Sequence, residues 1–303
     1  MPELNDPEVY LSVLDTLQTG VYIVDRTRRI RFWNEGAEQI TGYLRQDVVG
    51  RFLRDHLLTT SDDVKDPDSE PDDPINLVFR DGKPSTMDVS ILHKDGYRVP
   101  IVLRTHPIRN SRGAIIGAAE SFEKNRSASD WTRRQAGFAD FGCLDSVTGV
   151  AAQSFMETQL RENLTTFAEH SIPFGILLIQ IDHIDQFRAT RGPGVVTTIL
   201  RVIAQSVENC VRPTDLVGCW GANQFIAILM ECRESEVSRV GERVRKMIGQ
   251  AEIEWWGDKF SVTSPVGGAG CRAGDTTELL VERAAASLQE SIGKGGNCVT
   301  VLR

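Results

Sequence analysis

The stretch that most constrains the fold is residues 215–230, which read DLVGCWGANQFIAILM. Two apolar runs flank a polar break at residues 221–224, and the break opens at a glycine. Short apolar runs around such a break predict a β-hairpin. A hairpin tip holds backbone N–H groups and short side chains in fixed positions, so carboxylates there could hold a hard cation against a triphosphate. Here the third and fourth positions of the break are the amides Asn223 and Gln224.

Length and charge limit the classes of protein to which the chain can belong. The 303 residues suffice for two domains that each bury a core. A formal net charge of −8, with scattered basic residues, argues against a general binder of nucleic acid or of anionic membranes. We see no basic segment followed by an apolar core at the start, and no run that approaches about 18 apolar residues. We therefore expect a cytoplasmic protein without a membrane span.

The six cysteines occur singly, without a C-x-x-C pair or a nearby cluster of histidines. This spacing favours reduced thiols over disulfides or a zinc site. We therefore predict no structural metal.

The first part of the chain predicts short strands and capped helices in a definite order. Residues 8–18 have the apolar spacing of a helix, and residues 21–25 and 30–34 predict two strands around a polar turn. Asn34 is placed to cap the helix that follows, and Gly42 is placed to end it.

Later in the same part, residues 91–109 predict two strands around Asp95 and Gly96, a preferred hairpin pair. Residues 113–124 predict a closing strand. This succession resembles a PAS domain over residues 8–123. The resemblance implies a sensory or dimerising module around a small pocket.

The PAS-like part gives no reason to predict a particular cofactor. The first cysteine of the chain is Cys143, beyond this part, so the thiol with which light-sensing flavin members form an adduct is missing. His56 stands where a haem-binding member of the family would supply an axial ligand. The simpler interpretation is a histidine at a helix edge that faces water or a carbonyl. The same interpretation applies to His93 and His106, which lie in or beside the predicted hairpin.

Two further segments differ in composition from the predicted domains. Residues 61–74 are dense in Asp, Glu and Pro, without the spacing of a calcium loop, and predict a solvated insertion. Residues 124–143 predict either a short signalling helix or a passive linker. One helical face of this linker would carry Trp131, Gln135, Phe138 and Phe141.

Residues 144–303 contain five landmarks in the order of a second family. They are LDSVTGVAAQSFMETQL, FGILLIQIDHIDQF, GCWGANQFIAILM, VTSPVGGAG and ERAAASLQESIGKGGNCV. The first resembles the D-x-L-T-G-L motif, and the third resembles the signature hairpin, of GGDEF domains, the fold of diguanylate cyclases. The implied fold is a mostly antiparallel sheet with packed helices, related to the ferredoxin-like core of nucleotidyl cyclases. The whole chain is therefore predicted to be α+β.

Active GGDEF domains join two GTP molecules into cyclic di-GMP across a dimer, and this chemistry needs Mg²⁺ held by anionic oxygen ligands. The resemblance places Gln180 where the family has a metal-binding aspartate. It places Asn223 and Gln224 where the family has acidic signature residues. Because a carboxamide is neutral, three expected negative charges are missing. Asp182 remains close by, but in the family that neighbour is not the principal metal ligand.

The positions that contact guanine and phosphate also differ from the family. Arg188 and Thr197 stand where the family has an asparagine and an aspartate, and Pro193 replaces a histidine between them. Ile292 and Gly296 align with a phosphate-contacting lysine and the arginine that follows it. Loss of one preorganised group typically costs about 10² to 10³ in rate. We therefore predict a pseudo-diguanylate cyclase with no catalytic residues and no metal site.

One binding motif of the family is retained. Arg212 and Asp215 form an R-x-x-D motif at the register of the product-inhibition site of many diguanylate cyclases, and Arg243 aligns with a second arginine of that site. A guanidinium group can donate to guanine O6 and N7, and a carboxylate can accept from its N1–H and N2–H groups. The resemblance thus implies that these three residues bind cyclic di-GMP. The simpler interpretation is that Asp215 begins a strand and Arg243 is an exposed helix residue.

Three functions remain open at this point. The first is a receptor, a PAS-containing homodimer that binds cyclic di-GMP and acts on an unidentified downstream protein. The second is a scaffold that binds no nucleotide and presents Trp220, Trp255 and Trp256 to partner proteins. The third is a diguanylate cyclase with unorthodox ligands, which Mg²⁺-dependent GTP turnover would reveal.

Overall fold

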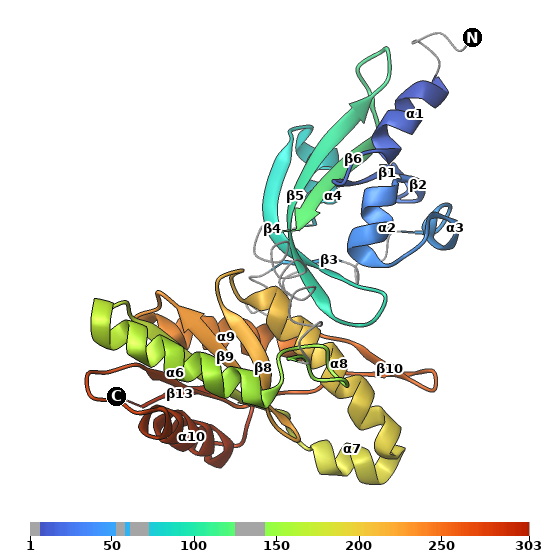
Figure 1. Cartoon of the computed structure of the whole chain (residues 1–303). Helices are drawn as coiled ribbons and strands as arrows, with labels where there is room; N and C mark the ends of the chain where they lie inside the picture. The colour runs from blue at the N-terminus through green and yellow to red at the C-terminus, as the bar shows by residue number, and fades with distance from the viewer. Residues whose placement is uncertain (1–6, 53–57, 61–72, 125–142, 303) are drawn as a thin grey trace. The chain divides into compact units, whose positions relative to one another are not determined.

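The computed structural model describes residues 7–52, 58–60, 73–124 and 143–302. The chain divides into two compact units, Met1–Arg126 and Ser127–Arg303, and each combines antiparallel strands with helices, as predicted for an α+β chain (Figure 1). The linker prediction, most of the acidic insertion and His56 lie outside the described residues. No helix in the described part of the chain is long and apolar enough to cross a membrane.

The first unit is built on a six-stranded antiparallel sheet with the order β2-β1-β6-β5-β4-β3. The strands are β1 (Gly20–Asp25), β2 (Ile30–Trp33), β3 (Leu58–Thr60), β4 (Ser85–Leu92), β5 (Arg98–Arg109) and β6 (Ile115–Lys124). The helices are α1 (Pro7–Asp15), α2 (Glu35–Thr41), α3 (Arg45–Val48) and α4 (Pro74–Asp81). The predicted hairpin is confirmed, because β4 and β5 pair across the turn that contains Asp95 and Gly96.

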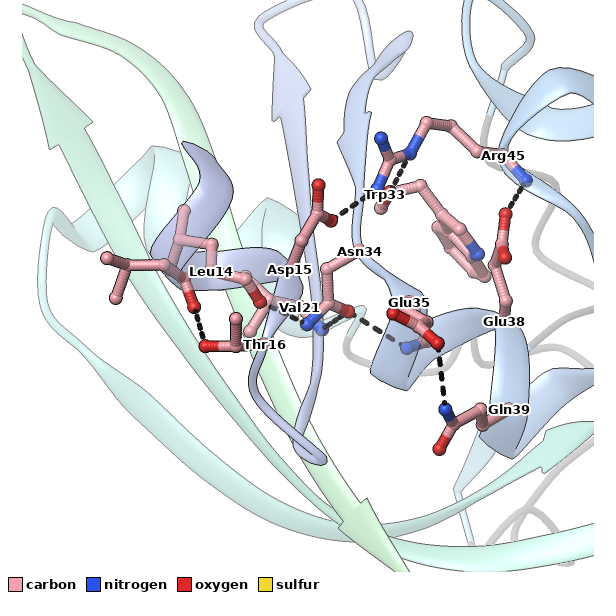
Figure 2. A network of polar contacts seen from close by, with 12 residues as sticks. Leu14, Asp15, Thr16, Val21, Trp33, Asn34, Glu35, Glu38, Gln39 and Arg45 are labelled. Atoms are coloured by element: carbon pink, nitrogen blue, oxygen red, sulfur yellow. Dashed lines mark hydrogen bonds and ion pairs between the residues drawn. The ribbon is translucent and has the colours of Figure 1, made fainter. Parts of the chain in front are cut away.

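Asn34 caps α2, as predicted, and also joins it to two other elements (Figure 2). Its Oδ1 atom accepts hydrogen bonds from the backbone N–H groups of Ala37 (2.8 Å) and Val21 (2.7 Å). Its Nδ2 atom donates to the carbonyl oxygens of Leu14 (2.8 Å) and Thr19 (2.9 Å). The side chain is completely buried, and all four of its hydrogen-bonding positions are used. One amide therefore fixes α1, β1 and α2 together.

The second unit is built on a five-stranded sheet with the order β13-β12-β7-β9-β8, in which only the β12–β13 pair is parallel. The strands are β7 (Phe174–Gln180), β8 (Leu216–Gly221), β9 (Gln224–Met230), β12 (Val266–Gly270) and β13 (Val299–Val301). A separate pair consists of β10 (Ile253–Trp255) and β11 (Asp258–Phe260). The helices are α6 (Gln153–His170), α7 (Ile184–Arg191), α8 (Pro193–Cys210), α9 (Glu234–Gly249) and α10 (Thr277–Gly293).

The sheet of the second unit is covered on both faces. Helices α6 and α10 share one apolar core with Ile176 and Leu178 of β7. Leu177, which points to the opposite face, lies against Gly241 of α9. The predicted hairpin of residues 215–230 is confirmed as β8 and β9. Strand β9 pairs with β7, and β8 forms the edge of the sheet.

The glycines of β12 allow α10 to approach the sheet closely. A Cβ atom at Gly267 would lie 2.2 Å from the backbone nitrogen of Leu288. Ser287 of α10 donates a hydrogen bond of 3.0 Å to the carbonyl oxygen of Gly268. The glycine-rich sequence of this strand therefore follows from backbone contact with the last helix.

Candidate functional site

The tip of the β8–β9 hairpin lies beside the end of β7, and two glutamine side chains meet there. Gln180 and Gln224 are direct partners in the register of β7 and β9, and Gln224 Nε2 donates a hydrogen bond of 2.9 Å to Gln180 Oε1. The backbone N–H group of Gln180 donates to the carbonyl oxygen of Pro265 (3.2 Å), and its carbonyl oxygen accepts from the hydroxyl of Ser264. The structure thus brings two of the three predicted amide positions into direct contact.

The third amide position, Asn223, lies at the hairpin tip between β8 and β9. Its Oδ1 atom is buried and has no hydrogen-bond partner in the described part of the chain. A buried polar atom without a hydrogen-bond partner destabilises the folded state, and such atoms are unusual in folded proteins. The hairpin tip therefore carries a polar group whose hydrogen-bonding capacity is not used within the chain.

Asp182 follows β7 and links it to the turn after α10. Its Oδ2 atom accepts hydrogen bonds from the hydroxyl of Thr263 (2.6 Å) and from the backbone N–H group of Asn297 (3.2 Å). A Cβ atom at Gly296 would lie 2.8 Å from both of its carboxylate oxygens. The carboxylate is therefore committed to holding this turn in place.

These side chains do not suit a magnesium ion that carries a triphosphate. Mg²⁺ requires near-octahedral oxygen ligands and is bound in nucleotide sites through carboxylates. Gln180, Asn223 and Gln224 are neutral, and Asp182 is the one charged group among the four residues described above. Within the described ranges, no group of three or more His, Cys, Asp or Glu side chains could hold a metal ion. The residues at the hairpin tip therefore do not fit a magnesium ion.

Three residues that align with the family's guanine- and phosphate-contacting positions lie on three different helices. Arg188 of α7 forms an exposed ion pair with Asp185 (2.9 Å). Thr197 lies in the first turns of α8, and Ile292 near the end of α10 packs against the apolar core. In the described part of the chain, none of these residues forms a hydrogen bond or ion pair with the amides of the hairpin tip.

The R-x-x-D motif folds into a tight connection between α8 and β8. Asp215 Oδ2 accepts a hydrogen bond from the backbone N–H group of Arg212 (2.8 Å), and Oδ1 accepts one from that of Met230 (2.9 Å). Only 4% of Asp215 is exposed, and this burial raises the pKa of its carboxyl group, against the opposing effect of the two backbone hydrogen bonds. The carboxylate therefore braces the start of β8 against the end of β9.

The two arginines of the predicted ligand site are exposed and lie near this buried carboxylate. The positive charges of Arg212 and Arg243 oppose the rise in the pKa of Asp215 that burial causes. The thiol of Cys210, at the end of α8, donates to the carbonyl oxygen of Arg243 (3.5 Å) and so joins α8 to α9. Neither guanidinium group forms an ion pair with a residue that the structure describes.

The tryptophans proposed as contact residues differ in exposure. Trp220 is partly buried against the core of the second unit, and Trp255 lies beside Gly194 at the start of α8. Trp256 forms the turn between β10 and β11 and is 91% exposed. The histidines of the first unit also differ, since His93 stacks on Tyr97 with ring centroids 4.2 Å apart whereas His106 is exposed.

Sequence reasoning missed a buried glutamate in the first unit. Glu120 of β6 is completely buried and accepts hydrogen bonds from the hydroxyls of Tyr22 and Thr105. The signal was present in the sequence, because Ala118, Glu120 and Phe122 alternate along a predicted strand whose other partners on that face are apolar. An acidic residue at an inward position of such a strand is unusual and indicates a specific role.

Comparison with known proteins agrees with this architecture. A family model described as "Diguanylate cyclase, GGDEF domain" matches residues 143–298, and a model of the PAS fold matches residues 8–120. Diguanylate cyclase A of Treponema denticola is 29% identical over 161 residues, which cover 52% of this chain and 43% of that protein. Diguanylate cyclase DosC of Escherichia coli is 25% identical over 157 residues, which cover 52% of this chain and 34% of that protein. The match therefore spans less than half the length of these relatives.

Solved structures show the same fold in the second unit. The diguanylate cyclase SiaD of Pseudomonas aeruginosa, solved with its activator SiaC, has a TM-score of 0.53 and 26% identity, covering 57% of this chain and 67% of that chain. The GGDEF domain of DgcB from Caulobacter crescentus, solved with c-di-GMP, has a TM-score of 0.51 and 21% identity, covering 53% of this chain and 93% of that domain. With its GGDEF match extending over more than half of its length, and with a PAS fold preceding it, the chain belongs to the GGDEF domain family.

Proposed function

We propose that this chain is a cytoplasmic signalling protein in which the PAS unit, residues 8–123, is the sensor. Its GGDEF unit, residues 144–303, binds cyclic di-GMP without synthesising it. The observation that carries the proposal is the hydrogen bond between Gln224 and Gln180, which pairs two neutral amides where the family has acidic residues. Residues 124–143 join the two units.

Several features of the site support the absence of cyclase activity. Active members of the family neutralise the triphosphate with Mg²⁺, and the charge on carboxylate ligands is what makes a small divalent cation bind. The amides Gln180 and Gln224 satisfy each other, and the carboxylate of Asp182 is engaged by Thr263 and Asn297. Arg188 is similarly paired with its helical neighbour. Loss of the metal ligands alone would cost at least about 10² to 10³ in rate.

The binding of cyclic di-GMP is supported by the exposed pair Arg212 and Arg243. A guanidinium group presents a fixed fork of N–H donors, which suits both phosphate oxygens and the O6 and N7 acceptors of guanine. The DgcB domain, which shares this fold, was solved with c-di-GMP. Because Asp215 is buried and bonded to two backbone N–H groups, we assign the ligand contacts to the two arginines and a positioning role to Asp215.

Calorimetric titration of the full chain with cyclic di-GMP, and separately with GTP and Mg²⁺, tests this proposal. We expect cyclic di-GMP to bind with micromolar or tighter affinity and GTP not to bind. Arg212→Ala and Arg243→Ala should each weaken binding at least about tenfold, as expected for the loss of a charge-assisted hydrogen bond. Arg161→Ala is the matched control, because Arg161 is an exposed arginine on α6. Mg²⁺-dependent turnover of GTP by the unmodified chain would overturn the proposal.

A scaffold without nucleotide binding is the second candidate, and exposed Trp256 favours it. Tryptophan is enriched among the residues that contribute most to binding at protein interfaces, and the exposed side chain of Trp256 is accessible to a partner. The relative SiaD was solved with an activator protein. Absence of binding to both nucleotides would select this candidate. In either case we propose that the chain forms a homodimer and acts on an unidentified downstream protein. Analytical ultracentrifugation can test whether the homodimer forms.

A further inference from the structure

Three neighbouring strands of the first unit place three polar side chains together in its core. In the register of the sheet, Glu120 of β6 lies directly opposite Tyr22 of β1 on one side and Thr105 of β5 on the other. None of the three is more than 1% exposed. Tyr22 also stacks on Trp33, with ring centroids 5.3 Å apart, and meets the edge of Phe122 at 6.0 Å. The carboxyl group therefore lies among aromatic rings and away from solvent.

The two hydroxyl partners suit both protonation states of this carboxyl group. Tyr22 donates to Glu120 Oε2, and Thr105 donates to Glu120 Oε1 at 2.5 Å. A hydroxyl group can also accept a hydrogen bond, so either partner can turn to receive the proton of a neutral glutamic acid. An arginine partner would hold the group ionised, and a purely apolar pocket would hold it neutral. Both forms of the carboxyl group can therefore form hydrogen bonds with the two hydroxyl groups.

Two charged groups near the site act on it in opposite directions. Arg28, in the turn after β1, forms an ion pair with Asp73, which caps α4. The charge of Asp73 raises the pKa of Glu120, and the charge of Arg28 lowers it. Burial is the largest influence, and it raises the pKa of Glu120 to about 7 in spite of the two hydroxyl donors. The pKa of Tyr22 is raised further above its ordinary range, chiefly by burial, so its phenol stays neutral.

We propose that Glu120 is a proton-binding site through which the PAS unit responds to pH near neutrality. Nothing in this inference depends on cyclic di-GMP or on the state of the GGDEF unit. Gain of a proton removes a buried charge from the middle of the sheet, and loss of the proton restores it. Glu120 lies on β6, the last strand of the first unit, so its charge acts on the packing of that strand against β1 and β5.

The direction of the response follows from linkage. The pKa of Glu120 is higher in the folded unit than the ordinary value of 4.5, so the folded unit binds more protons between that value and about 7. The free energy of unfolding of the first unit therefore falls as pH rises through this window. Above the window, the contribution of Glu120 to this free energy is constant. The sheet should open more readily on the alkaline side of the window.

Infrared difference spectroscopy of the full chain, titrated from about pH 5 to about pH 9, follows the carboxyl group directly. We expect a protonated-carboxyl band that disappears with a midpoint near neutrality and that is absent in Glu120→Gln. Glu123→Gln is the matched control, because Glu123 lies on the same strand but is exposed. A band that persists in Glu120→Gln, or no band that titrates near neutrality, would overturn the proposal.

A second variant tests the site without removing the carboxyl group. Thr105→Val removes one donor to the carboxylate while keeping the side-chain shape, so the midpoint should move to higher pH by about one unit, a tenfold change in proton affinity. Amide hydrogen exchange of β1, β5 and β6, corrected for the intrinsic effect of pH, should become faster as pH rises in the unmodified chain and remain flat in Glu120→Gln. An unchanged midpoint in Thr105→Val would contradict the assignment.

Discussion

At the scale of single residues, Asn34 shows how much of a unit can depend on one amide. It satisfies two backbone N–H groups and two carbonyl oxygens from three segments that are separate in the sequence. Asn34→Ala would remove a hydrogen-bond partner from each of the four groups, and the two backbone N–H groups among them are buried. We expect the first unit to lose about 3 kcal/mol of unfolding free energy, since each unsatisfied buried group is costly.

The measurement is differential scanning calorimetry of the full chain, followed at the transition of the first unit. Asn110→Ala is the matched control, because Asn110 accepts two hydrogen bonds from the backbone N–H groups of Arg112 and Ala114 (both 3.0 Å) in an exposed turn. This control should cost less than about 1 kcal/mol. Equal losses in the two variants would refute the joining role of Asn34.

A second prediction at this scale concerns Asp215, whose carboxylate could either support the fold or contact the ligand. Asp215→Ala removes the acceptor for two backbone N–H groups, so we expect the second unit to lose about 2 kcal/mol of unfolding free energy. Arg212→Ala removes an exposed side chain and should change stability by less than about 0.5 kcal/mol. Urea unfolding followed by circular dichroism compares the two. If Asp215→Ala keeps its stability but loses cyclic di-GMP binding, the carboxylate contacts the ligand.

Among the elements, the β10–β11 hairpin has a turn whose first residue is poorly suited to its conformation. Trp256 (φ 52°) and Gly257 (φ 85°) both adopt left-handed backbone angles, for which Asn-Gly is a preferred pair. Trp256→Asn should therefore raise the unfolding free energy of the second unit by up to about 1 kcal/mol, since asparagine tolerates this conformation better. Trp255→Ala should lower it, because Trp255 packs against the start of α8. Thermal unfolding of both variants tests these two expectations. Destabilisation by Trp256→Asn would show that the indole ring of Trp256 supports the fold.

The elements themselves could largely be predicted from the sequence, because their signals are local. Alternation of apolar residues, the Asp95-Gly96 turn, the Asn34 cap and the hairpin of residues 215–230 each depend on neighbours in the chain. The structure confirms these elements. The contents of the predicted sites depend instead on residues that are distant in sequence. The contact of Gln180 with Gln224 spans 44 positions, and that of Asp182 with Asn297 spans 115.

Contacts between residues distant in the sequence also explain which features of the sites could not be predicted. The R-x-x-D motif follows from the resemblance to GGDEF domains, but the resemblance does not reveal that the carboxylate of Asp215 turns inward to Met230. The proton site needs three strands in register, with Tyr22 and Glu120 98 positions apart. An inward glutamate could be noticed in the sequence, whereas its partners could not.

At the scale of the whole molecule, the proposed absence of cyclic di-GMP synthesis can be tested at the three amide positions. The variant Gln180→Asp, Asn223→Asp and Gln224→Glu restores the acidic residues that the family has at these positions. We expect it to gain affinity for Mg²⁺, seen as a rise in the melting temperature of the second unit on addition of Mg²⁺ that the unmodified chain does not show. Without Mg²⁺ the variant should be less stable, because three carboxylates repel each other and the bond between the glutamines is lost.

We expect this triple variant to remain without measurable GTP turnover, followed by release of pyrophosphate. Binding a metal supplies one part of phosphoryl transfer, while catalysis also depends on positioning of the nucleotide. Arg188 is held by Asp185, Ile292 packs into the core, and Gly296 has no side chain, so none of the three provides the contact that the family has there. Turnover by the triple variant together with Mg²⁺ stabilisation would mean that the amides alone silence the domain. Stabilisation without turnover would place the loss of activity in the nucleotide-binding positions as well, and would leave binding through Arg212 and Arg243 as the role of this unit.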